Sequence, residues 1–531
     1  MKEILKFSIN TIIPISLLII AGFVGYKEIL VPDSEKFQVN TIGTWFRNNG
    51  SFNRNPTTGN AGFEWAFNTN RYARYASGLW IGAKVNNDTL VTVAEYEYEY
   101  GPGYTDKSGD PQGGSDPMYR IYTITKGING KDRMNWPNSL LGNSDQGAPV
   151  IFDSLFGILK AADFGDKTMF YVYTDSYPAL HGSDPGSTAP LKADIKQLNF
   201  GLNTAGEPLK HVIFTQFIVI NRSQNIWHDT FFNLWTDDDI GESADDRIGC
   251  DSALKMGYTY NGDNMDAVYG SAPPAVAFIL LKGALKFTGN SSDVASFCLN
   301  SNRQNKTGFR DAGMTAFNAD GISDSYRESY RLMKGQTSTG NVVMHPQGYT
   351  TTLYYSGDPT SGSGWIQESS GDQSFLLSSG PVDVAPGDTQ VVTIAQIIAR
   401  GSNNIHSITL LRQYASDVKE FYMDCYNFDP VSVNEITTVK NDFRLYQNYP
   451  NPFNPVTKIK IEVSSQNRTS KNVKLVVFDI SGKEVLTLAD EKYSPGIYEF
   501  EFDGKDLSGG IYFYTLIAGS YKETKRMILL K

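Results

Sequence analysis

The stretch Lys458-Ile459-Lys460-Ile461-Glu462-Val463 alternates charged side chains with apolar ones. A period of two is typical of a half-buried β-strand, because successive side chains of a strand point to opposite faces. Two further stretches repeat the alternation, at residues 496–502 and 511–516, and residues 474–479 add another strand-like run. Pairs such as Ser481-Gly482 and Asp503-Gly504 separate these stretches and are typical of turns. Residues 442–531 therefore predict a small Ig-like β-sandwich.

This C-terminal module also carries four motifs in a fixed order. They are the opening Leu445-x-Gln447-Asn448-Tyr449-Pro450-Asn451-Pro452-Phe453-Asn454-Pro455, a strand and turn at 473–485, Leu507-Ser508-Gly509-Gly510-Ile511-Tyr512-Phe513-Tyr514, and a basic ending at 522–531. The set resembles the type A C-terminal sorting domain of proteins that Bacteroidota export through the type IX (Por) secretion system. The resemblance covers residues 442–531, about one sixth of the chain. It implies export to the medium or the outer-membrane surface, with the type IX machinery as the partner of this module; the alternative is an Ig-like domain with no part in export.

The N-terminus has the layout of a secretory signal peptide over residues 1–25. Lys2 and Lys6 form a short positive region, and residues 12–24 are largely apolar. This apolar run is shorter than the roughly 20 residues that span a membrane. Small residues for cleavage are present without a clean pair, so an uncleaved anchor is the alternative. Together the two ends of the chain predict a route through the periplasm to the outside of the cell.

Composition predicts a β-rich body over residues 36–429. The chain holds 49 Gly, 23 Pro, 30 Tyr and 30 Phe, which favour turns and strands over long helices. Apolar residues spaced by three and four predict a helix at 404–424, and a shorter helix is expected at 323–334. Strands are expected at 77–85, 95–100, 118–125, 168–174, 195–199, 211–221 and 390–399, with a turn-rich lead at 380–388. The predicted fold class is mainly β: a large β-sandwich-like body of one or two subdomains with a few helices, then a linker at 430–441 and the C-terminal sandwich.

The acidic excess of the chain lies in the body. Residues 441–531 hold 13 Lys and Arg and 11 Asp and Glu, so the net charge of −10 leaves −12 for residues 1–440. A polyanionic nucleic acid or an anionic membrane surface would be repelled by such a body. The charge therefore excludes nucleic acid as a partner and is compatible with divalent cations.

The densest acidic segment runs from Asp237 to Asp251, with seven carboxylates and one arginine. Carboxylates at this density repel one another unless they are solvated or bridged by a cation, and hard oxygen ligands suit Ca²⁺. An EF-hand is excluded, because Gly241 and Ile248 stand where that loop needs ligands. The predicted ligands of a structural Ca²⁺ are Asp237, Asp239, Asp245, Asp246 and Asp251. The alternative is a solvated acidic loop with Asx turns.

Three cysteines are too few for a disulfide framework. One pair can form in an oxidising compartment, and Cys250 with Cys298 is the expected pair, which leaves Cys425 as a thiol. The alternative is three isolated buried thiols.

Three phrases of the body resemble an uncharacterised family of secreted proteins that carry such C-terminal modules. They are Gly78-Leu79-Trp80-Ile81-Gly82-Ala83, the acidic segment from Trp235 to Asp251, and Ser379-Gly380-Pro381 with Pro386-Gly387-Asp388. The resemblance implies a shared architecture and no activity.

Catalytic motifs are absent from the sequence. The five histidines form no H-E-x-x-H pair, and no G-x-S-x-G elbow, Walker loop or dinucleotide fingerprint occurs. Tyr96, Tyr98 and Tyr100 alternate with glutamates and would share one face of a strand, either as a platform for a sugar or as packing. We therefore expect a non-enzymatic binding, adhesive or structural module with a glycan or surface ligand. The alternative is an extracellular hydrolase that acts on polysaccharide, whose two carboxylates would lie roughly 5–9.5 Å apart.

Overall fold

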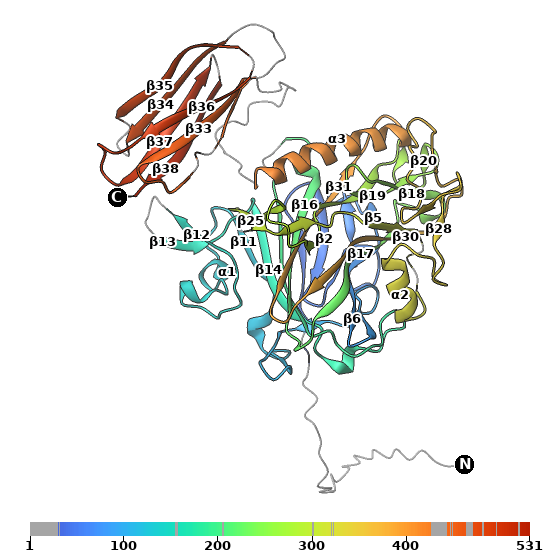
Figure 1. Cartoon of the computed structure of the whole chain (residues 1–531). Coiled ribbons are helices and arrows are strands. Elements are labelled where there is room, and N and C mark those ends of the chain that lie inside the picture. Colours follow the sequence, from blue (N-terminus) through green and yellow to red (C-terminus); the bar gives the residue numbers. More distant parts are fainter. Residues whose placement is uncertain are drawn as a thin grey trace, which may run out of the picture. The chain divides into compact units, whose positions relative to one another are not determined.

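The chain divides into two units in the computed structural model, residues 1–433 and residues 434–531 (Figure 1). The structure describes residues 30, 32–153, 158–203, 206–299, 302–319, 321, 323–425, 443–446, 448, 450–463, 471–479, 483–494, 496–518 and 521–530. The predicted signal peptide at 1–25 and the predicted linker at 430–441 lie outside these described residues.

Two large antiparallel sheets build the first unit, which we call the body. The first sheet has the order β27 (Ala316–Asn318), β30 (Gln373–Val384), β17 (Trp227–Asp238), β6 (Ala76–Val85), β3 (Ser51–Phe52), β2 (Ile42–Arg47), β4 (Phe63–Trp65) and β5 (Tyr72–Arg74), with β1 (Ser34–Gln38) on β2 and β7 (Asp88–Thr92) on β6. The second sheet has the order β11 (Tyr122–Thr125), β14 (Lys167–Thr174), β15 (Ala193–Gly201), β16 (Val212–Asn221), β31 (Thr389–Ala399), β22 (Ala275–Lys282), β19 (Met256–Asn261) and β18 (Asp246–Asp251), with β8 (Gly101–Pro102) on β14. The predicted mainly β fold is confirmed.

Short strands and three α-helices complete the described part of the body. The helices are α1 (Lys131–Met134), α2 (Tyr326–Met333) and α3 (Asn404–Met423). The short strand pairs are β9 (Tyr104–Thr105) with β10 (Pro111–Gln112), β12 (Val150–Asp153) with β13 (Ile158–Ala161), β20 (Met265–Asp266) with β21 (Gly270–Ser271), β23 (Leu285–Phe287) with β26 (Phe309–Asp311), β24 (Val294–Leu299) with β25 (Asn302–Thr307), and β28 (Val343–Met344) with β29 (Thr350–Thr351).

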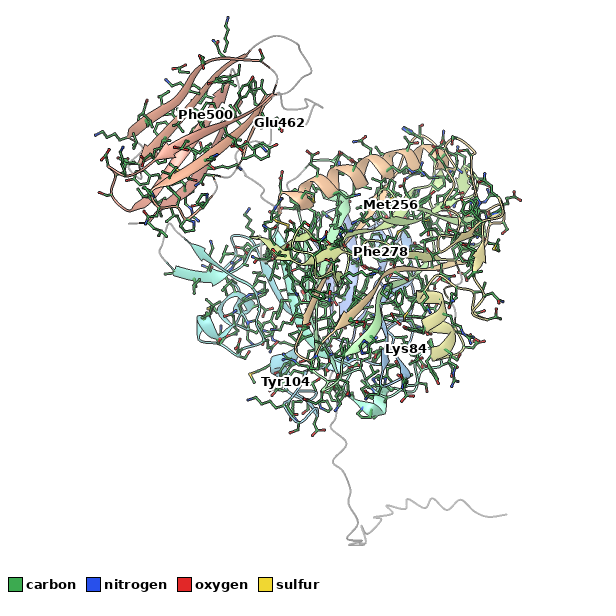
Figure 2. The ribbon with its side chains drawn as sticks, viewed as in Figure 1. Lys84, Tyr104, Met256, Phe278, Glu462 and Phe500 are labelled. Atoms are coloured by element: carbon green, nitrogen blue, oxygen red, sulfur yellow. A yellow bond between two sulfur atoms is a disulfide. The ribbon has the colours of Figure 1, made fainter. Side chains whose placement is uncertain are left out.

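The main core lies between the two large sheets. One cluster of buried residues joins Leu79 of β6 and Leu234 of β17 to Phe217 of β16 and Ile394 of β31. The sheets therefore pack face to face as a sandwich, in which strand alternation sends every second residue of each strand into the core. Phe278 of β22 belongs to this core, and Figure 2 marks it inside the body.

Packing against both faces of β6 explains the residue types from Gly78 to Ala83. Leu79, Ile81 and Ala83 face the core between the sheets, while Trp80 lies in a second cluster on the outer face. A Cβ on Gly82 would stand 2.6 Å from Met333 Sδ of α2. The small residue at position 82 therefore lets α2 sit directly on the sheet.

Both predicted helices are present. The helix α3 covers the outer face of the second sheet, where Ile408, Leu411 and Val418 join Ile397 of β31 in one buried cluster. Its first turn is capped by Asn403, whose side chain accepts a hydrogen bond from the amide of His406 at 2.7 Å. Among the described residues, no helix is long and apolar enough to cross a membrane.

Two further expectations about the body are wrong. Residues 95–100 form a bend closed by a bridge between Ala94 and Tyr98, so their tyrosines do not share a face. Tyr96 is 40% exposed, whereas Tyr100 is fully buried, and a platform made of these side chains is excluded. The expected turn-rich lead at 380–388 is also shorter than predicted, because β30 continues to Val384.

The expected disulfide is wrong as well. Cys298 on β24 bonds to Cys425, which follows α3, and Cys250 is a buried free thiol. The sequence could not rank these pairs, because they depend on the packing of the β24–β25 hairpin beside the end of α3.

The second unit is a smaller sandwich with its own buried core. One sheet has the order β32 (Phe443–Leu445), β33 (Val456–Val463) and β36 (Gly496–Asp503), and the other has the order β35 (Glu484–Tyr493), β34 (Lys471–Asp479), β37 (Gly510–Ala518) and β38 (Tyr521–Leu529). Ile459, Ile461 and Val463 point into the core with at most 2% exposure, as the alternation predicts. The predicted C-terminal sandwich is confirmed.

Candidate metal centre

The acidic segment begins at the end of β17, beside β30. In the antiparallel pairing of these strands, Asp237 stands opposite Ser374 and Asp238 opposite Gln373. Alternation places Asp238 toward the core and Asp237 and Asp239 on the outer side of the sheet. Asp372 comes just before β30, and continuing the same register sets it opposite Asp239.

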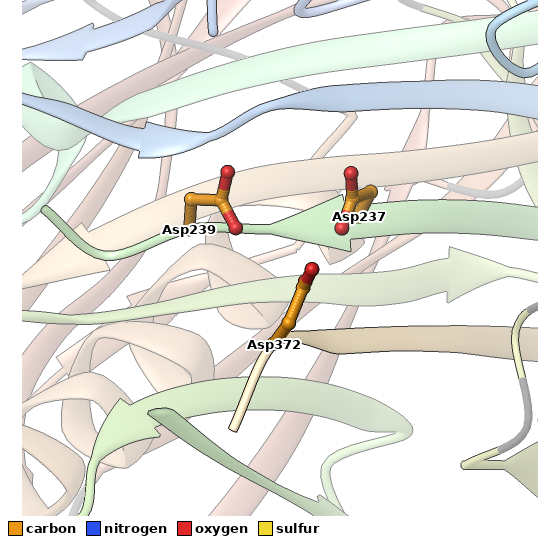
Figure 3. A group of neighbouring side chains, drawn as sticks. All are labelled: Asp237, Asp239 and Asp372. Atoms are coloured by element: carbon orange, nitrogen blue, oxygen red, sulfur yellow. The ribbon is translucent and has the colours of Figure 1, made fainter. Parts of the chain in front are cut away.

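Three carboxylates meet at this point. Oxygen atoms of Asp237, Asp239 and Asp372 lie within 4.8 Å of one another, and Figure 3 shows Asp372 pointing toward the other two. Asp237 is buried, Asp239 is half-buried and Asp372 is exposed. We call this group the acidic triad. The acidic triad could hold a metal ion bound by the buried Asp237 on one side and open to solvent on the side of Asp372.

The surroundings of the acidic triad raise the pKa values of two of its carboxyl groups. The pKa of Asp237 is raised to about 7, mainly by burial and to a smaller extent by the neighbouring carboxylates of Asp239 and Asp372. The pKa of Asp239 is raised to about 6, first by burial and then by the charge of Asp372. The phenol of Tyr96 donates a hydrogen bond to Asp237 Oδ2 at 2.6 Å, which opposes the rise. A cation would replace this repulsion with attraction, because it favours the ionised form of each carboxylate.

An aromatic frame positions Tyr96 beside Asp237. The Tyr96 ring packs edge-on against Trp235 at 5.2 Å and against Tyr75 at 5.9 Å. The guanidinium of Arg54 lies 5.5 Å from the Tyr96 ring and donates a hydrogen bond to its carbonyl at 3.1 Å. The phenol that contacts the acidic triad is thus held by packing on both sides.

Asp238 has a different role from its two neighbours. Its Oδ1 lies 3.3 Å from Arg74 Nε, and both side chains are fully buried. Its Oδ2 accepts a hydrogen bond at 2.8 Å from Thr259 of β19, in the opposite sheet. Arg74 also stacks 3.7 Å above the ring of Phe278. Asp238 therefore links the two sheets and is not available to a metal ion at the acidic triad.

Among the predicted ligands, only Asp237 and Asp239 belong to the acidic triad. Asp245 accepts a hydrogen bond from Asn261 at 2.8 Å, and burial raises its pKa to about 6. Asp251 pairs with Arg412, with Oδ2 and Nε separated by 3.3 Å. The structure thus brings two of the five predicted ligands together with Asp372, which the sequence analysis did not predict.

Asp246 is fully buried, and only one of its two carboxylate oxygens has a hydrogen-bond partner among the described residues. Its Oδ2 accepts a hydrogen bond from the amide of Ile240 at 2.8 Å. Its Oδ1 has no hydrogen-bond partner among the described residues, and the same holds for Oδ1 of Asn261, the residue opposite it on β19. Burial raises the pKa of Asp246 well above its ordinary value. Burial in a low-dielectric interior disfavours the charged form of this carboxyl.

Two surface hollows of about 270 Å³ each lie on the body, and both are open to solvent. The first contains two carboxylates, Asp251 and Asp358, and both pair with Arg412. The second is lined by residues that include Arg120 and Lys131. The carboxylates of the first hollow are thus engaged by an arginine, and no carboxylate is among the residues that line the second.

Comparison with known proteins assigns the second unit. Residues 447–530 match the family model described as the secretion system C-terminal sorting domain. The second unit is a Por secretion sorting domain. This sorting domain indicates export across the outer membrane to the surface or the medium, with the secretion machinery as its partner. The resemblance of the four C-terminal motifs is therefore confirmed.

The comparisons assign no function to the body. No curated protein matches the chain. Among solved structures, a polysaccharide lyase aligns with 64% of this chain at 7% identity and a TM-score of 0.18. The chain spans about a third of the length of that lyase, 34%, and a likeness this low carries no argument about fold or activity.

Proposed function

We propose that the body, residues 36–429, is a non-enzymatic binding, adhesive or structural module that acts outside the cell. The signal peptide at 1–25 would take the chain to the periplasm, and the sorting domain at 442–531 would take it across the outer membrane. A structural Ca²⁺ at Asp237, Asp239 and Asp372 would hold the strand ends together in the extracellular medium.

The convergence of three carboxylates within 4.8 Å is the observation that supports the ion. Ca²⁺ takes six to eight oxygen ligands in a flexible arrangement, whereas Mg²⁺ demands a near-ideal octahedron. The acidic triad suits Ca²⁺, because its three carboxylates range from buried to exposed. Water or a ligand oxygen can therefore complete the coordination shell from the exposed side of Asp372. The ion would join β17 to the start of β30 and neutralise the repulsion that raises the pKa of Asp237.

A non-enzymatic role is supported by the way the body uses its charged residues. Asp238 is bound to Arg74, and Asp251 and Asp358 are bound to Arg412. These carboxylates therefore suit a stabilising role better than acid–base catalysis.

A hydrolase that acts on polysaccharide remains the second candidate, because one observation favours it. The pKa of Asp237 is raised to about 7, so this carboxyl is partly protonated at neutral pH, as a general acid must be. Catalysis would require a second carboxylate to approach the same substrate bond.

A glycan array run beside a broad screen for polysaccharide hydrolysis separates the two candidates. The purified full-length chain should bind an array component or a cell surface and release no reducing ends from any polysaccharide. Release of reducing ends that is lost in Asp237→Asn would replace the binding function with the hydrolase.

A further inference from the structure

The two ends of the sorting domain lie against each other. The amide of Phe453 in the opening motif donates to the carbonyl of Ile528 at 2.9 Å, and the amide of Leu530 donates to the carbonyl of Phe453 at 2.8 Å. Asn451 adds two bonds: its Nδ2 donates to the carbonyl of Arg526 at 3.3 Å, and its Oδ1 accepts from the amide of Ile528 at 2.9 Å. The opening motif thus runs along the terminal strand β38.

These four bonds occupy the outer edge of β38 from Arg526 to its end. The strand is the last in the order β35-β34-β37-β38, and its inner edge pairs with β37 along its length. Its outer edge would otherwise present a row of backbone groups to any passing strand. The side-chain amide of Asn451 carries a donor and an acceptor, so it substitutes for a peptide group of a neighbouring strand. We call this arrangement the edge cap.

The edge cap has a buried and an exposed side. Phe453, Met527 and Leu529 are at most 2% exposed and join the core of the sorting domain. Asn451 and Arg526 lie on the exposed side, with Leu530 50% exposed. Side chains from both ends of the domain therefore form one continuous surface.

We propose that the export machinery recognises the edge cap as one folded surface, so that neither the opening motif nor the terminal strand is an export signal alone. The proposal rests on the export function of the sorting domain. Recognition by strand addition needs free backbone groups on an edge strand. On β38 these groups are engaged by Asn451 and Phe453 from Arg526 to Leu530. The partner that fits is a preformed surface that reads side chains, and not an open sheet edge that adds a strand.

The motif supplies its own matched control. Asn451 and Asn454 are both exposed asparagines that precede a proline. Asn451 bonds to β38 through its side chain, whereas no such bond from the Asn454 side chain occurs within the described part of the sorting domain. Asn451→Ala therefore removes two of the four bonds of the edge cap, whereas Asn454→Ala alters the motif and leaves all four in place.

The test uses the full-length chain in its native host. Export is measured as the fraction of the chain in the medium or on the cell surface, and hydrogen exchange of the purified chain reports the amides of β38. We expect Asn451→Ala to speed exchange at Ile528 about five- to tenfold, as loss of one hydrogen bond implies, and to lower export at least fivefold. Asn454→Ala should change neither. Deletion of residues 442–531 should abolish export.

Three results would overturn the proposal. The first is normal export of Asn451→Ala although exchange at Ile528 is faster. The second is unchanged exchange in Asn451→Ala, which would show that Asn451 does not hold the edge cap. The third is an equal export defect in Asn454→Ala, which would show that the motif is read as sequence. Normal export after deletion of residues 442–531 would instead refute the export function of the domain itself.

Discussion

Replacement of Cys298 and Cys425 by serine should be the most destabilising of the cysteine changes. The two residues are 127 positions apart, so their bond closes a long loop in the unfolded chain. In the chain-entropy model a loop of this length contributes about 5 kcal/mol. Strain and residual structure commonly reduce that figure, so we expect a loss of about 3–5 kcal/mol. The loss should fall on the body, where the bond ties the end of α3 to the β24–β25 hairpin.

Cys250 provides the matched control for this change. It is buried like the other two cysteines, but its thiol only donates to the carbonyl of Tyr354 at 3.3 Å. A serine hydroxyl can still donate to this carbonyl and no cross-link is lost, so Cys250→Ser should cost at most about 1.5 kcal/mol. The assay is urea unfolding of the oxidised full-length chain, followed at the transition of the body. Equal losses in Cys250→Ser and in the double variant would refute the assigned pairing, as would unchanged stability of the reduced wild type.

Two further predictions concern pH and the sorting domain. In the folded state the pKa values of Asp237 and Asp239 are raised to about 7 and about 6, above the ordinary 3.8. Without metal, the folded state therefore binds more protons than the unfolded state between about pH 4 and 7. The stability that this site contributes then falls as the pH rises from about 4 to 7. Ca²⁺ needs the ionised carboxylates, so the melting difference between Ca²⁺ and chelator should grow over the same range; a difference that shrinks with pH would contradict the site. Tyr514→Phe removes the phenol oxygen that accepts a hydrogen bond from the amide of Asn448 at 2.7 Å. This change should destabilise the sorting domain by about 1–3 kcal/mol in a calorimetric melt. An unchanged melting transition would show that the phenol is dispensable.

Local patterns predicted most of the fold. Alternation in 458–463 and helical spacing in 404–424 set which face of each element is apolar, and the structure buries those faces. The same rule failed at 95–100, where the alternation of Glu and Tyr is regular but the backbone bends. Packing against Trp235 and Tyr173 decides the positions of Tyr96 and Tyr100, and neither partner is near in sequence.

The sequence predicted only part of the candidate site. Asp237 and Asp239 share a face because they are two residues apart on one strand, and this alternation is a local property. Asp372 enters through the pairing of β17 with β30, which the sequence does not fix. The acidic density alone did not separate Asp237 and Asp239 from the other predicted ligands, since Asp251 pairs with Arg412 and Asp245 accepts a hydrogen bond from Asn261. Residue type indicated the chemistry, and strand pairing selected the members of the group.

Calorimetric titration of Ca²⁺ into the full-length chain tests the central proposal most directly. Wild type should bind one Ca²⁺ at the acidic triad, and a hundredfold excess of free ion over Kd should stabilise the body by about 2.7 kcal/mol. Asp239→Asn and Asp372→Asn should abolish this binding, while Asp251→Asn, which alters the carboxylate bound to Arg412, should retain it. Absence of binding in wild type, or loss of binding in Asp251→Asn with retention in Asp372→Asn, would contradict the proposed metal centre.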